Sequence, residues 1–528
     1  MTWTHGLDYG ARSAGDPRDP CDPWPGRLPA PAARGLRRVV MPIVSDLIEQ
    51  ARLAARALAE FGQGLRHPTV RLGVTGLSRA GKTVFITALV HGLTRGGRFP
   101  VFDALADGRI AGARLSPQPD DAVPRFDYER HVRAIVERRE WPESTRQISE
   151  LRVIIDYQSI SGAMRTLTLD IVDYPGEWLL DLPLLDKGYE QWSAEAMQHA
   201  RHDNRTTLSA AFRAHLETID PLAPADEHAV IEAARRFTAY LHACREERHT
   251  PGLVPPGRFL MPGDLADSPA LTFAPLELPP EREPPSDSTW ALMRRRYDAY
   301  RDVVVRPFFH EHFARLDRQI VLVDVLAALD AGPQALRDLQ DALAGILGCF
   351  RVGRSGFLGA LFKPSADKIL FAATKADELH HTAHDRLEAI LKRMTAHAIA
   401  RAGDAGAAVD VIALAAVRAT REAFVQGQGG GLPSIVGLAA PGVSADGRPF
   451  DGNTEIAVFP GDLPADVASL FADDAEARRP APVAPRGDGF RSVRFRPPAL
   501  EMAADGIPAM PHIRLDRTLQ FLIGDRLR

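Results

Sequence analysis

Gly76-Leu77-Ser78-Arg79-Ala80-Gly81-Lys82-Thr83 matches the phosphate-loop pattern G-x-x-x-x-G-K-[ST], which lies between a strand and a helix. The apolar stretch Val70–Thr75 before it predicts that strand, and the run Thr83–Leu93 after it predicts the helix. Backbone N–H groups of such a loop and the N-terminus of the next helix both attract phosphate. The stretch therefore predicts a P-loop NTPase, an α/β fold that binds its nucleotide where the first strand ends.

Within this loop the side chains have separate expected roles. We expect Lys82 to reach the β- and γ-phosphates and the hydroxyl of Thr83 to ligate Mg²⁺. The expected nucleotide contacts in this part of the chain are Gly76, Ser78, Arg79, Ala80, Gly81, Lys82, Thr83 and Val84.

A second motif follows the strand-like run Leu167–Val172. There Asp173-Tyr174-Pro175-Gly176 matches D-x-x-G, by which a GTPase places an acid near Mg²⁺ and a glycine N–H against the γ-phosphate. We expect Asp173 and Gly176 to act in this way. Between the two motifs we expect a mobile switch whose threonine approaches the metal and the γ-phosphate. Thr145 is the candidate, and a plain turn before a strand is the alternative.

A third motif indicates which base is bound. Thr374-Lys375-Ala376-Asp377 matches [NT]-K-x-D and follows the strand-like run Ile369–Ala373. A carboxylate at Asp377 can accept two hydrogen bonds from guanine, whereas adenine would leave it unpaired at a cost of about 1–3 kcal/mol. We expect Lys375 to lie along the base. The motifs therefore predict GTP or GDP as the nucleotide, with Mg²⁺.

A fourth, weaker element follows the strand-like residues 411–414. The loop with Ala416 and Val417 falls where a GTPase offers a backbone N–H to guanine O6, although Ala415 stands where serine is usual. We expect the remaining nucleotide contacts to come from Asp173, Gly176, Thr374, Lys375, Asp377, Ala416 and Val417.

Taken together, GLSRAGKT, DYPGEW, TKAD and LAAVRAT resemble the motifs of the bacterial YcjX family of stress-associated P-loop proteins. The resemblance extends from about residue 45 to the C-terminus. It implies a Ras-like GTP-binding core with a helical insertion, GTP hydrolysis, a link to envelope stress and a partner protein at the inner membrane.

The hydrolysis step departs from that of small GTPases, because Glu177 stands where a glutamine would orient water. A carboxylate beside the γ-phosphate repels its charge unless the carboxylate is paired. The phosphate loop also resembles that of guanylate-binding proteins, whose arginine at the position of Arg79 acts as a finger in cis, an effect worth about 10³–10⁵ in rate. Alternatively, Arg79 points to solvent or binds the α-phosphate. The candidate catalytic residues are Arg79, Lys82, Glu177 and Thr145, and the candidate metal ligands are Thr83, Asp173 and Thr145.

The length of 528 residues suffices for about three domains at roughly 150 residues each. Strand-like runs that alternate with helical patterns predict a mostly parallel sheet with helices on both faces. The predicted parts are residues 1–44, a disordered Pro-rich tail; 45–182, the first part of the GTPase core with an N-terminal helix at Ser45–Phe61; 183–310, a helical insertion with a Pro-rich loop; 311–424, the second part of the core; and 425–528, a Gly- and Pro-rich extension with strands and a final helix.

Composition and hydropathy exclude several classes of protein. With 64 Lys+Arg against 68 Asp+Glu, the net charge of −4 lacks the basic excess typical of nucleic-acid binding. The most apolar stretch, Ile320–Leu329, is too short to span a bilayer and contains Asp324. The first residues lack the basic and apolar regions of a signal peptide. We therefore expect a cytoplasmic protein without a transmembrane segment, peripheral to the inner membrane if it meets a membrane at all.

Two other function classes stay open. An ATP-dependent phosphotransferase or ATPase would need an arginine-rich lid and a second substrate site, and neither is clear in the sequence. A non-hydrolysing interaction protein that keeps GDP as a structural element is compatible with Glu177. Two histidine groups, 310–312 and 380–384, lack zinc-site spacing, and charged turns explain them.

Overall fold

The computed structural model describes thirteen ranges of the chain, all within one contiguous unit that ends at Arg528. The ranges are residues 68–118, 120–145, 147–247, 253–266, 268–278, 283–348, 366–404, 406–427, 430–443, 449–471, 490, 492–500 and 508–528. The tail predicted at 1–44 and the helix predicted at Ser45–Phe61 lie outside these described residues.

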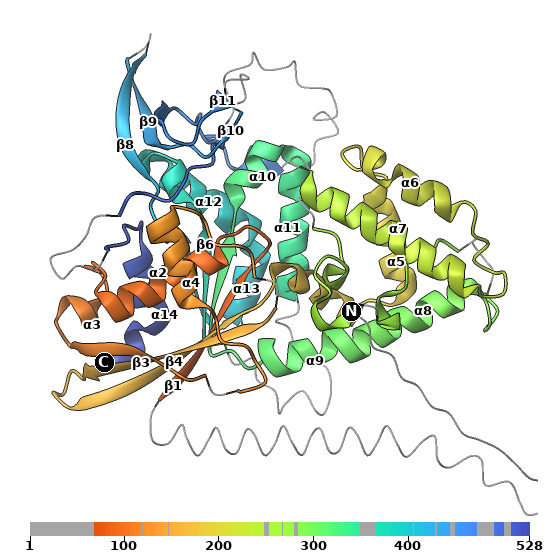
Figure 1. The fold of residues 1–528 in the computed structure, drawn as a ribbon, viewed down its shortest axis with the longest axis horizontal. Helices are drawn as coiled ribbons and strands as arrows, with labels where there is room; N and C mark the ends of the chain where they lie inside the picture. The colour runs from red at the N-terminus through yellow and green to blue at the C-terminus, as the bar shows by residue number, and fades with distance from the viewer. Residues whose placement is uncertain are drawn as a thin grey trace, which may run out of the picture. The chain divides into compact units, whose positions relative to one another are not determined.

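Seven strands form one sheet in the order β2-β3-β4-β1-β5-β6-β7 (Figure 1). They are β1 (Thr69–Gly76), β2 (Ile110–Ser116), β3 (Ser149–Gln158), β4 (Met164–Asp173), β5 (Arg318–Val323), β6 (Lys368–Ala373) and β7 (Ala408–Ala413). Five neighbouring strands of the sheet, β4, β1, β5, β6 and β7, run parallel to one another. At one edge, β3 pairs antiparallel with β4, and β2 pairs antiparallel with β3. The predicted α/β fold with a mostly parallel sheet is confirmed. Because parallel strands end at the same edge, the loops after β1, β4, β6 and β7 meet there.

Apolar side chains cover both faces of the central strands, so these strands read as continuous apolar runs. On β5, Ile320 and Leu322 belong to one buried cluster, whereas Val321 and Val323 belong to another on the opposite face. Strand β2, in contrast, lies at the edge and is only half-buried. Its sequence IAGARLS carries little apolar signal, which is why the sequence did not predict it.

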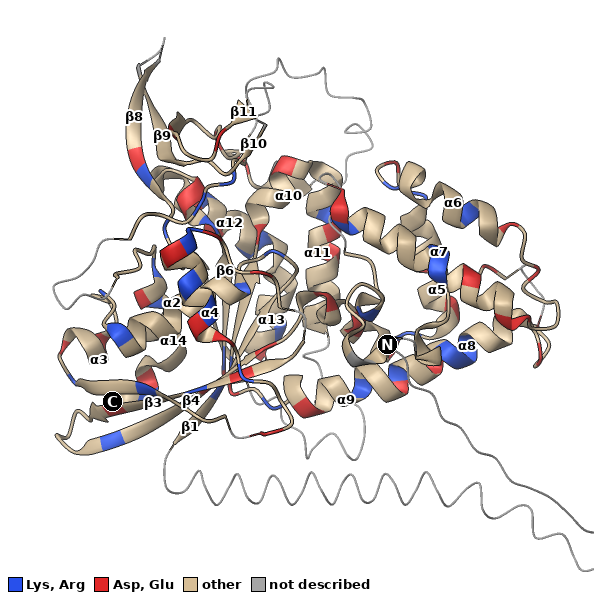
Figure 2. Ribbon diagram, viewed as in Figure 1, with Lys and Arg blue, Asp and Glu red and all other residues tan. Residues whose placement is uncertain are grey.

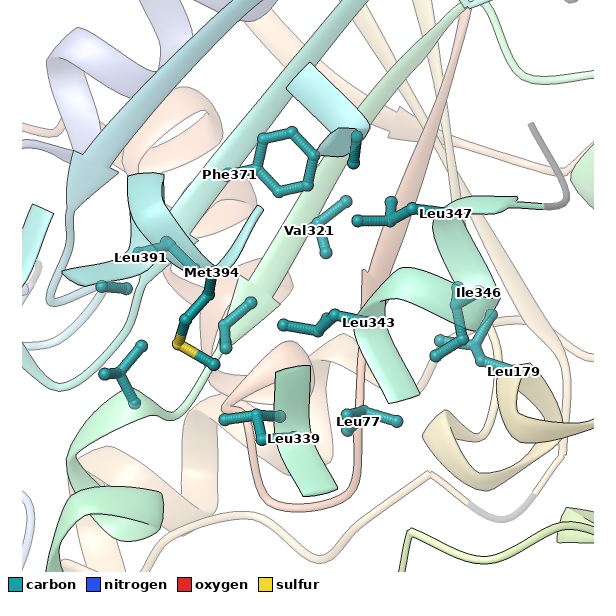
Figure 3. Packing of buried hydrophobic residues seen from close by; sticks show 14 of the residues in the cluster. Leu77, Leu179, Val321, Leu339, Leu343, Ile346, Leu347, Phe371, Leu391 and Met394 are labelled. Carbon is teal, nitrogen blue, oxygen red and sulfur yellow. The ribbon is translucent and has the colours of Figure 1, made fainter. Parts of the chain in front are cut away.

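Helices pack on both clusters. One face is covered by α2 (Lys82–Arg95) and α14 (Leu515–Ile523), and the other by α11 (Pro333–Gly348) and α12 (His384–Met394). Figure 3 shows residues of this second cluster, to which Leu343 of α11 and Met394 of α12 both belong. Further helices of the core are α3 (Asp103–Ala106), α4 (Tyr128–Arg133), α10 (Val325–Ala331) and α13 (Ala396–Asp404), and shorter turns are η1 (Ala134–Arg138), η9 (Ala376–Glu378), η10 (His381–Ala383), η11 (Ala468–Phe471) and η12 (Gly524–Leu527).

Helices are the regular elements of the described chain between β4 and β5, and we refer to residues 187–316 as the helical region (Figure 1). A 3₁₀ segment, η2 (Gly176–Asp186), leads into it from the D-x-x-G motif. Its elements are α5 (Tyr189–Ala200), α6 (Thr206–Leu216), α7 (Glu227–Glu246), η3 (Gly257–Phe259), η4 (Gly263–Leu265), η5 (Pro269–Leu271), α8 (Thr289–Tyr300), η6 (Arg301–Val305), α9 (Arg306–Phe308) and η7 (Phe309–Phe313). Aromatic side chains such as Trp192, Phe237 and Tyr297 form its own buried cluster. The domain bounds at 183 and 310 stay predictions.

After β7 the chain forms smaller sheets and then returns to the core. One antiparallel sheet joins β8 (Thr420–Gly427), β9 (Gly430–Leu438) and β12 (Glu455–Val458), and a second joins β10 (Gly442–Val443) and β11 (Pro449–Phe450). The final helix α14 buries Leu515, Leu519 and Leu522 beside α2. The last residues therefore complete the core.

Charge is distributed evenly over the described residues. Figure 2 shows acidic and basic residues interspersed along the core and the helical region, in keeping with the small net charge of −4. No helix in the described ranges has the length and hydropathy that crossing a bilayer requires.

A buried ion pair ties the helical region to the core. The side chains of Arg205 and Asp338, 1% and 7% exposed, approach to 2.6 Å between Nη2 and Oδ2. Gln334 donates a further hydrogen bond to Asp338. Because both charges are withdrawn from water, each depends on the other for compensation.

We therefore predict that Asp338→Ala lowers the free energy of unfolding by about 3–5 kcal/mol, since Arg205 loses its buried counter-ion. Urea denaturation measures this loss. Glu232→Ala, which breaks surface pairs with Arg235 and Arg236, serves as the control and should cost no more than about 1 kcal/mol. Similar losses in the two variants would contradict the prediction.

Candidate functional site

The phosphate loop leaves β1 at Gly76 and enters α2 at Lys82. Arg79 and Gly81 both adopt left-handed backbone conformations, with φ values of 65° and 87°. Left-handed residues within a turn direct successive N–H groups towards one concave side, the arrangement that binds anions. For Gly81 this conformation explains the glycine, whereas for Arg79 it is a strained conformation of the kind found at functional sites.

The D-x-x-G turn lies directly against this loop. A Cβ atom at Gly176 would lie 2.4 Å from the carbonyl oxygen of Gly76 and 2.8 Å from the amide nitrogen of Ser78. Beside this contact, the hydroxyls of Tyr174 and Thr75 are hydrogen-bonded at 2.6 Å. Only glycine fits at position 176, and the ends of β1 and β4 are joined through it.

Three of the predicted metal and phosphate residues converge beside Lys82. Thr145 donates a hydrogen bond of 2.6 Å to Oδ2 of Asp173, and its hydroxyl lies 3.3 Å from that of Thr83. Lys82 donates a hydrogen bond of 2.9 Å to the carbonyl oxygen of Gly76. The predicted grouping of these side chains in space therefore exists in the structure, while their roles stay predictions.

Burial shifts the pKa of both charged side chains, Asp173 and Lys82. It raises the pKa of Asp173 to about 6, against the opposing effects of Lys82 and the Thr145 hydrogen bond. Burial also lowers the pKa of Lys82, against the opposing charges of Asp173 and Glu177. Oδ1 of Asp173 has no hydrogen-bond partner within the described part of the chain. A buried carboxylate oxygen beside two hydroxyls is the donor set that Mg²⁺ prefers, so these residues fit the predicted metal.

Two cavities lie beside the group formed by Lys82, Thr83, Thr145 and Asp173. The smaller one, of about 60 Å³, is enclosed by the phosphate loop, by Pro142, Ser144 and Thr145 and by Glu177. The larger one, of about 460 Å³, lies among residues 124–149 and also contacts Asp173. Pro142, Ser144 and Thr145 line both cavities, so the segment that carries the predicted switch threonine borders each of them.

The T-K-x-D loop lies at the same edge of the sheet. Lys375, with a φ of 61°, forms an ion pair with Asp324 at the end of β5. Asp377 is buried, which raises the pKa of its carboxyl, and Oδ2 accepts a hydrogen bond of 2.7 Å from the N–H of Ala419. The Thr420 hydroxyl donates to the carbonyl oxygen of Asp377.

The sequence did not predict the contacts of Ala419 and Thr420 with Asp377. The predicted residues of this loop lie just before them: Ala416 is half-buried, and the side chain of Val417 packs into the core. Local signal was absent, because nothing in Ala419 or Thr420 themselves indicates a partner in the turn η9, far away along the chain. The role of Ala416 and Val417 stays a prediction.

Glu177 is 3% exposed and paired with a residue that the sequence did not single out. Nη2 of Arg245, on α7, lies 2.8 Å from Oε1 of Glu177. Arg79 lies near this pair: burial lowers the pKa of its guanidinium, as do the charges of Arg494 and Arg245, against the charge of Glu177. Glu177 therefore has a counter-ion from the helical region.

The histidines at 380–384 separate in the structure. His381 lies 2.7 Å from Glu422 of β8, measured from Nδ1 to Oε2, with His380 beside it. His384 instead bonds the carbonyl oxygen of Ala376. Sequence reasoning missed Glu422 because it lies on a different strand.

Comparison with known proteins confirms the family resemblance drawn from the motifs. A family model described as "YcjX-like family, DUF463" matches residues 70–527. A relative from Escherichia coli K12, named Ras-like GTPase YcjX, is 38% identical over 485 residues, which cover 87% of this chain and 96% of the relative. A relative from Shewanella oneidensis with the same name is 34% identical over 500 residues, which cover 89% of this chain and 98% of the relative.

We predict that Asp173→Asn stabilises the nucleotide-free protein in EDTA at pH 8 by on the order of 1–3 kcal/mol, because it removes a buried charge. The carboxyl pKa is about 6 in the folded chain, above its ordinary value of 3.8. Below about pH 6 the folded parent takes up the proton and loses this penalty, so the gain should shrink on acidification. Urea denaturation across pH measures the gain, with the exposed Asp121→Asn as control. A gain that grows towards low pH would contradict the prediction.

Proposed function

The chain belongs to the YcjX-like family, and on this basis we propose that it is a P-loop GTPase that binds GTP with Mg²⁺ and hydrolyses it to GDP. In this proposal the protein acts in stress response in the cytoplasm, at or near the inner membrane. Its nucleotide state controls a partner protein. The observation that carries the proposal is the hydrogen-bonded set of Thr83, Thr145 and Asp173 beside Lys82.

Phosphate binding is supported by the backbone of residues 76–83. The left-handed residues Arg79 and Gly81 and the N-terminus of α2 direct N–H groups towards a concave space, where Lys82 adds a positive charge. An anionic phosphate there would offset the buried charge of the lysine, whose pKa burial lowers. The site therefore gains favourable electrostatics when it is filled.

Mg²⁺ would be held by Thr83, Asp173 and Thr145, the last two of which are already hydrogen-bonded to each other. When bound, the ion would neutralise negative charge on the phosphates. The protein's own contribution is to keep Asp173 ionised and oriented: Lys82 and the Thr145 hydroxyl both counter the effect of burial on its pKa.

Selection of guanine is assigned to Asp377, with Thr374 and Lys375 beside it and with backbone N–H groups at Ala416 and Val417. In support, the carboxylate is buried, and one of its oxygens is already oriented by the N–H of Ala419. A buried carboxylate without a matching donor is costly, so a base that offers two N–H groups is favoured over adenine.

For hydrolysis we assign Arg79, Lys82, Glu177 and Thr145 to the γ-phosphate end. These four side chains line the same cavity of about 60 Å³. In this assignment Arg79 neutralises the charge that develops in transfer, while Glu177 lies where attacking water is oriented. An ATP-dependent phosphotransferase or ATPase, or a GDP-bound protein without hydrolysis, is the alternative, and single-turnover hydrolysis of GTP and ATP with Lys82→Ala as control distinguishes them.

We predict that Asp377→Asn weakens GTP binding at least tenfold, equivalent to about 1.4 kcal/mol, and admits xanthine nucleotide, because an amide can donate where the carboxylate accepted. Titration with fluorescent nucleotides measures both affinities. Asp385→Asn, at a side chain that is 93% exposed, is the matched control. If the parent protein binds ATP as tightly as GTP, guanine selection is wrongly assigned.

We predict that Arg79→Ala lowers the GTP turnover number roughly 10³-fold and leaves GDP affinity within threefold of the parent. The reason is that the guanidinium stabilises charge that develops only during transfer. Turnover at saturating GTP and GDP titration test the two parts, with the exposed Arg95→Ala on α2 as control. An unchanged turnover number would exclude a role for Arg79 as a finger.

A further inference from the structure

We propose that Arg245, on α7 of the helical region, is a positioning residue for GTP hydrolysis that neutralises and orients Glu177 beside the phosphate loop. This inference rests on the proposed GTPase function and adds a residue from outside its four sequence motifs. It also gives the helical region a direct part in the chemistry.

Arg245 and Glu177 form a close ion pair. Nη2 of Arg245 lies 2.8 Å from Oε1 of Glu177, and the two side chains are 24% and 4% exposed. Nη1 of the same guanidinium lies 3.6 Å from the sulfur of Met261. Arg245 therefore contacts Glu177 and Met261, and its positive charge offsets that of a carboxylate that is almost fully buried.

Glu177 needs such a partner because of where it lies. It lines the cavity of about 60 Å³ together with Lys82 and Thr145. A free carboxylate there would oppose the negative γ-phosphate and would compete with it for the lysine. Pairing with Arg245 removes most of this repulsion and leaves an oxygen that can accept a hydrogen bond from water.

The backbone around Glu177 is also held by the helical region. The buried carboxylate of Asp181 accepts hydrogen bonds from the N–H groups of Gly257 (2.7 Å) and Arg258 (3.2 Å). It also accepts one of 2.6 Å from the hydroxyl of Tyr300. A Cβ atom at Gly257 would lie 1.7 Å from the carbonyl oxygen of Glu177, so the two backbones are in direct contact.

Trp178, the next residue, is held by the same loop. Its indole N–H donates a hydrogen bond of 2.9 Å to the carbonyl oxygen of Met261, and the guanidinium of Arg258 lies 3.1 Å from the ring centroid. The segment after the D-x-x-G motif is thus held by the phosphate loop at Gly176 and by the helical region from Glu177 onward. The position of the Glu177 side chain depends on both.

A double-mutant cycle on the full-length protein tests the proposal. Single-turnover GTP hydrolysis is measured for the parent, Arg245→Ala, Glu177→Gln and the double variant, together with GDP affinity and Tm. We expect Arg245→Ala to slow hydrolysis at least tenfold with GDP affinity within threefold of the parent. In the Glu177→Gln background the same change should alter the rate less than twofold, because the carboxylate through which Arg245 acts is gone.

Two further variants serve as controls. Arg235 lies on the same helix as Arg245 and is paired with Glu232 at the surface. The variant Arg235→Ala should therefore hydrolyse GTP at the rate of the parent. Arg245→Lys keeps the charge but not the planar fork, and should recover part of the rate. This variant also provides a folded comparison if Arg245→Ala does not fold.

Several results would overturn the proposal. Equal rate losses in the two backgrounds would show that Arg245 acts independently of Glu177. A joint fall of Tm, GDP affinity and rate in both Arg245→Ala and Arg245→Lys would show a structural role alone. If the parent hydrolyses GTP and Glu177→Gln matches it, Glu177 has no part in the reaction. If the parent binds GTP but does not hydrolyse it, the proposed function itself fails, and this inference fails with it.

Discussion

The contact between Gly176 and the backbone of the phosphate loop is the constraint on which the site depends. Because no Cβ atom fits there, the end of β4 lies against the end of β1 with backbone in contact with backbone. Asp173 therefore lies close enough to Lys82 for their charges to interact, and the Thr145 hydroxyl links its carboxylate to the hydroxyl of Thr83. Glu177 directly follows this glycine, and the same backbone contact therefore brings it to the cavity beside the phosphate loop, which it lines.

The site concentrates charges that are individually unfavourable in a buried setting. Burial raises the pKa of Asp173 and lowers that of Lys82, so the charged form of each group is penalised. Each charge is partly compensated by another within the set, and Arg245 compensates Glu177 from outside it. Such a site is costly to the folded protein, and the proposed phosphate and divalent cation would supply the missing charges.

The helical region and the core are joined by buried polar contacts as well as by apolar packing. Arg205 and Asp338 form an ion pair at one junction. At another, the carboxylate of Asp181 accepts three hydrogen bonds. Polar contacts of this kind require specific geometry, because an unpaired buried group is penalised by its desolvation. A displacement of the helical region would therefore alter the surroundings of Glu177, which is paired with Arg245 and in backbone contact with Gly257.

The sequence by itself determined the phosphate loop, the order of the central strands along the chain, and helices such as α11 and α12, because each depends on spacing between near neighbours. It also predicted that Asp173 and Asp377 belong to one site, because they follow β4 and β6 and the ends of parallel strands meet at one edge. The place of Thr145 in that site was predicted from its position before β3. Only the tertiary structure decided that Arg245 pairs with Glu177, that Ala419 bonds Asp377 and that the edge strand β2 joins the sheet. These contacts join residues that are distant along the chain, and burial, not local periodicity, selects their partners.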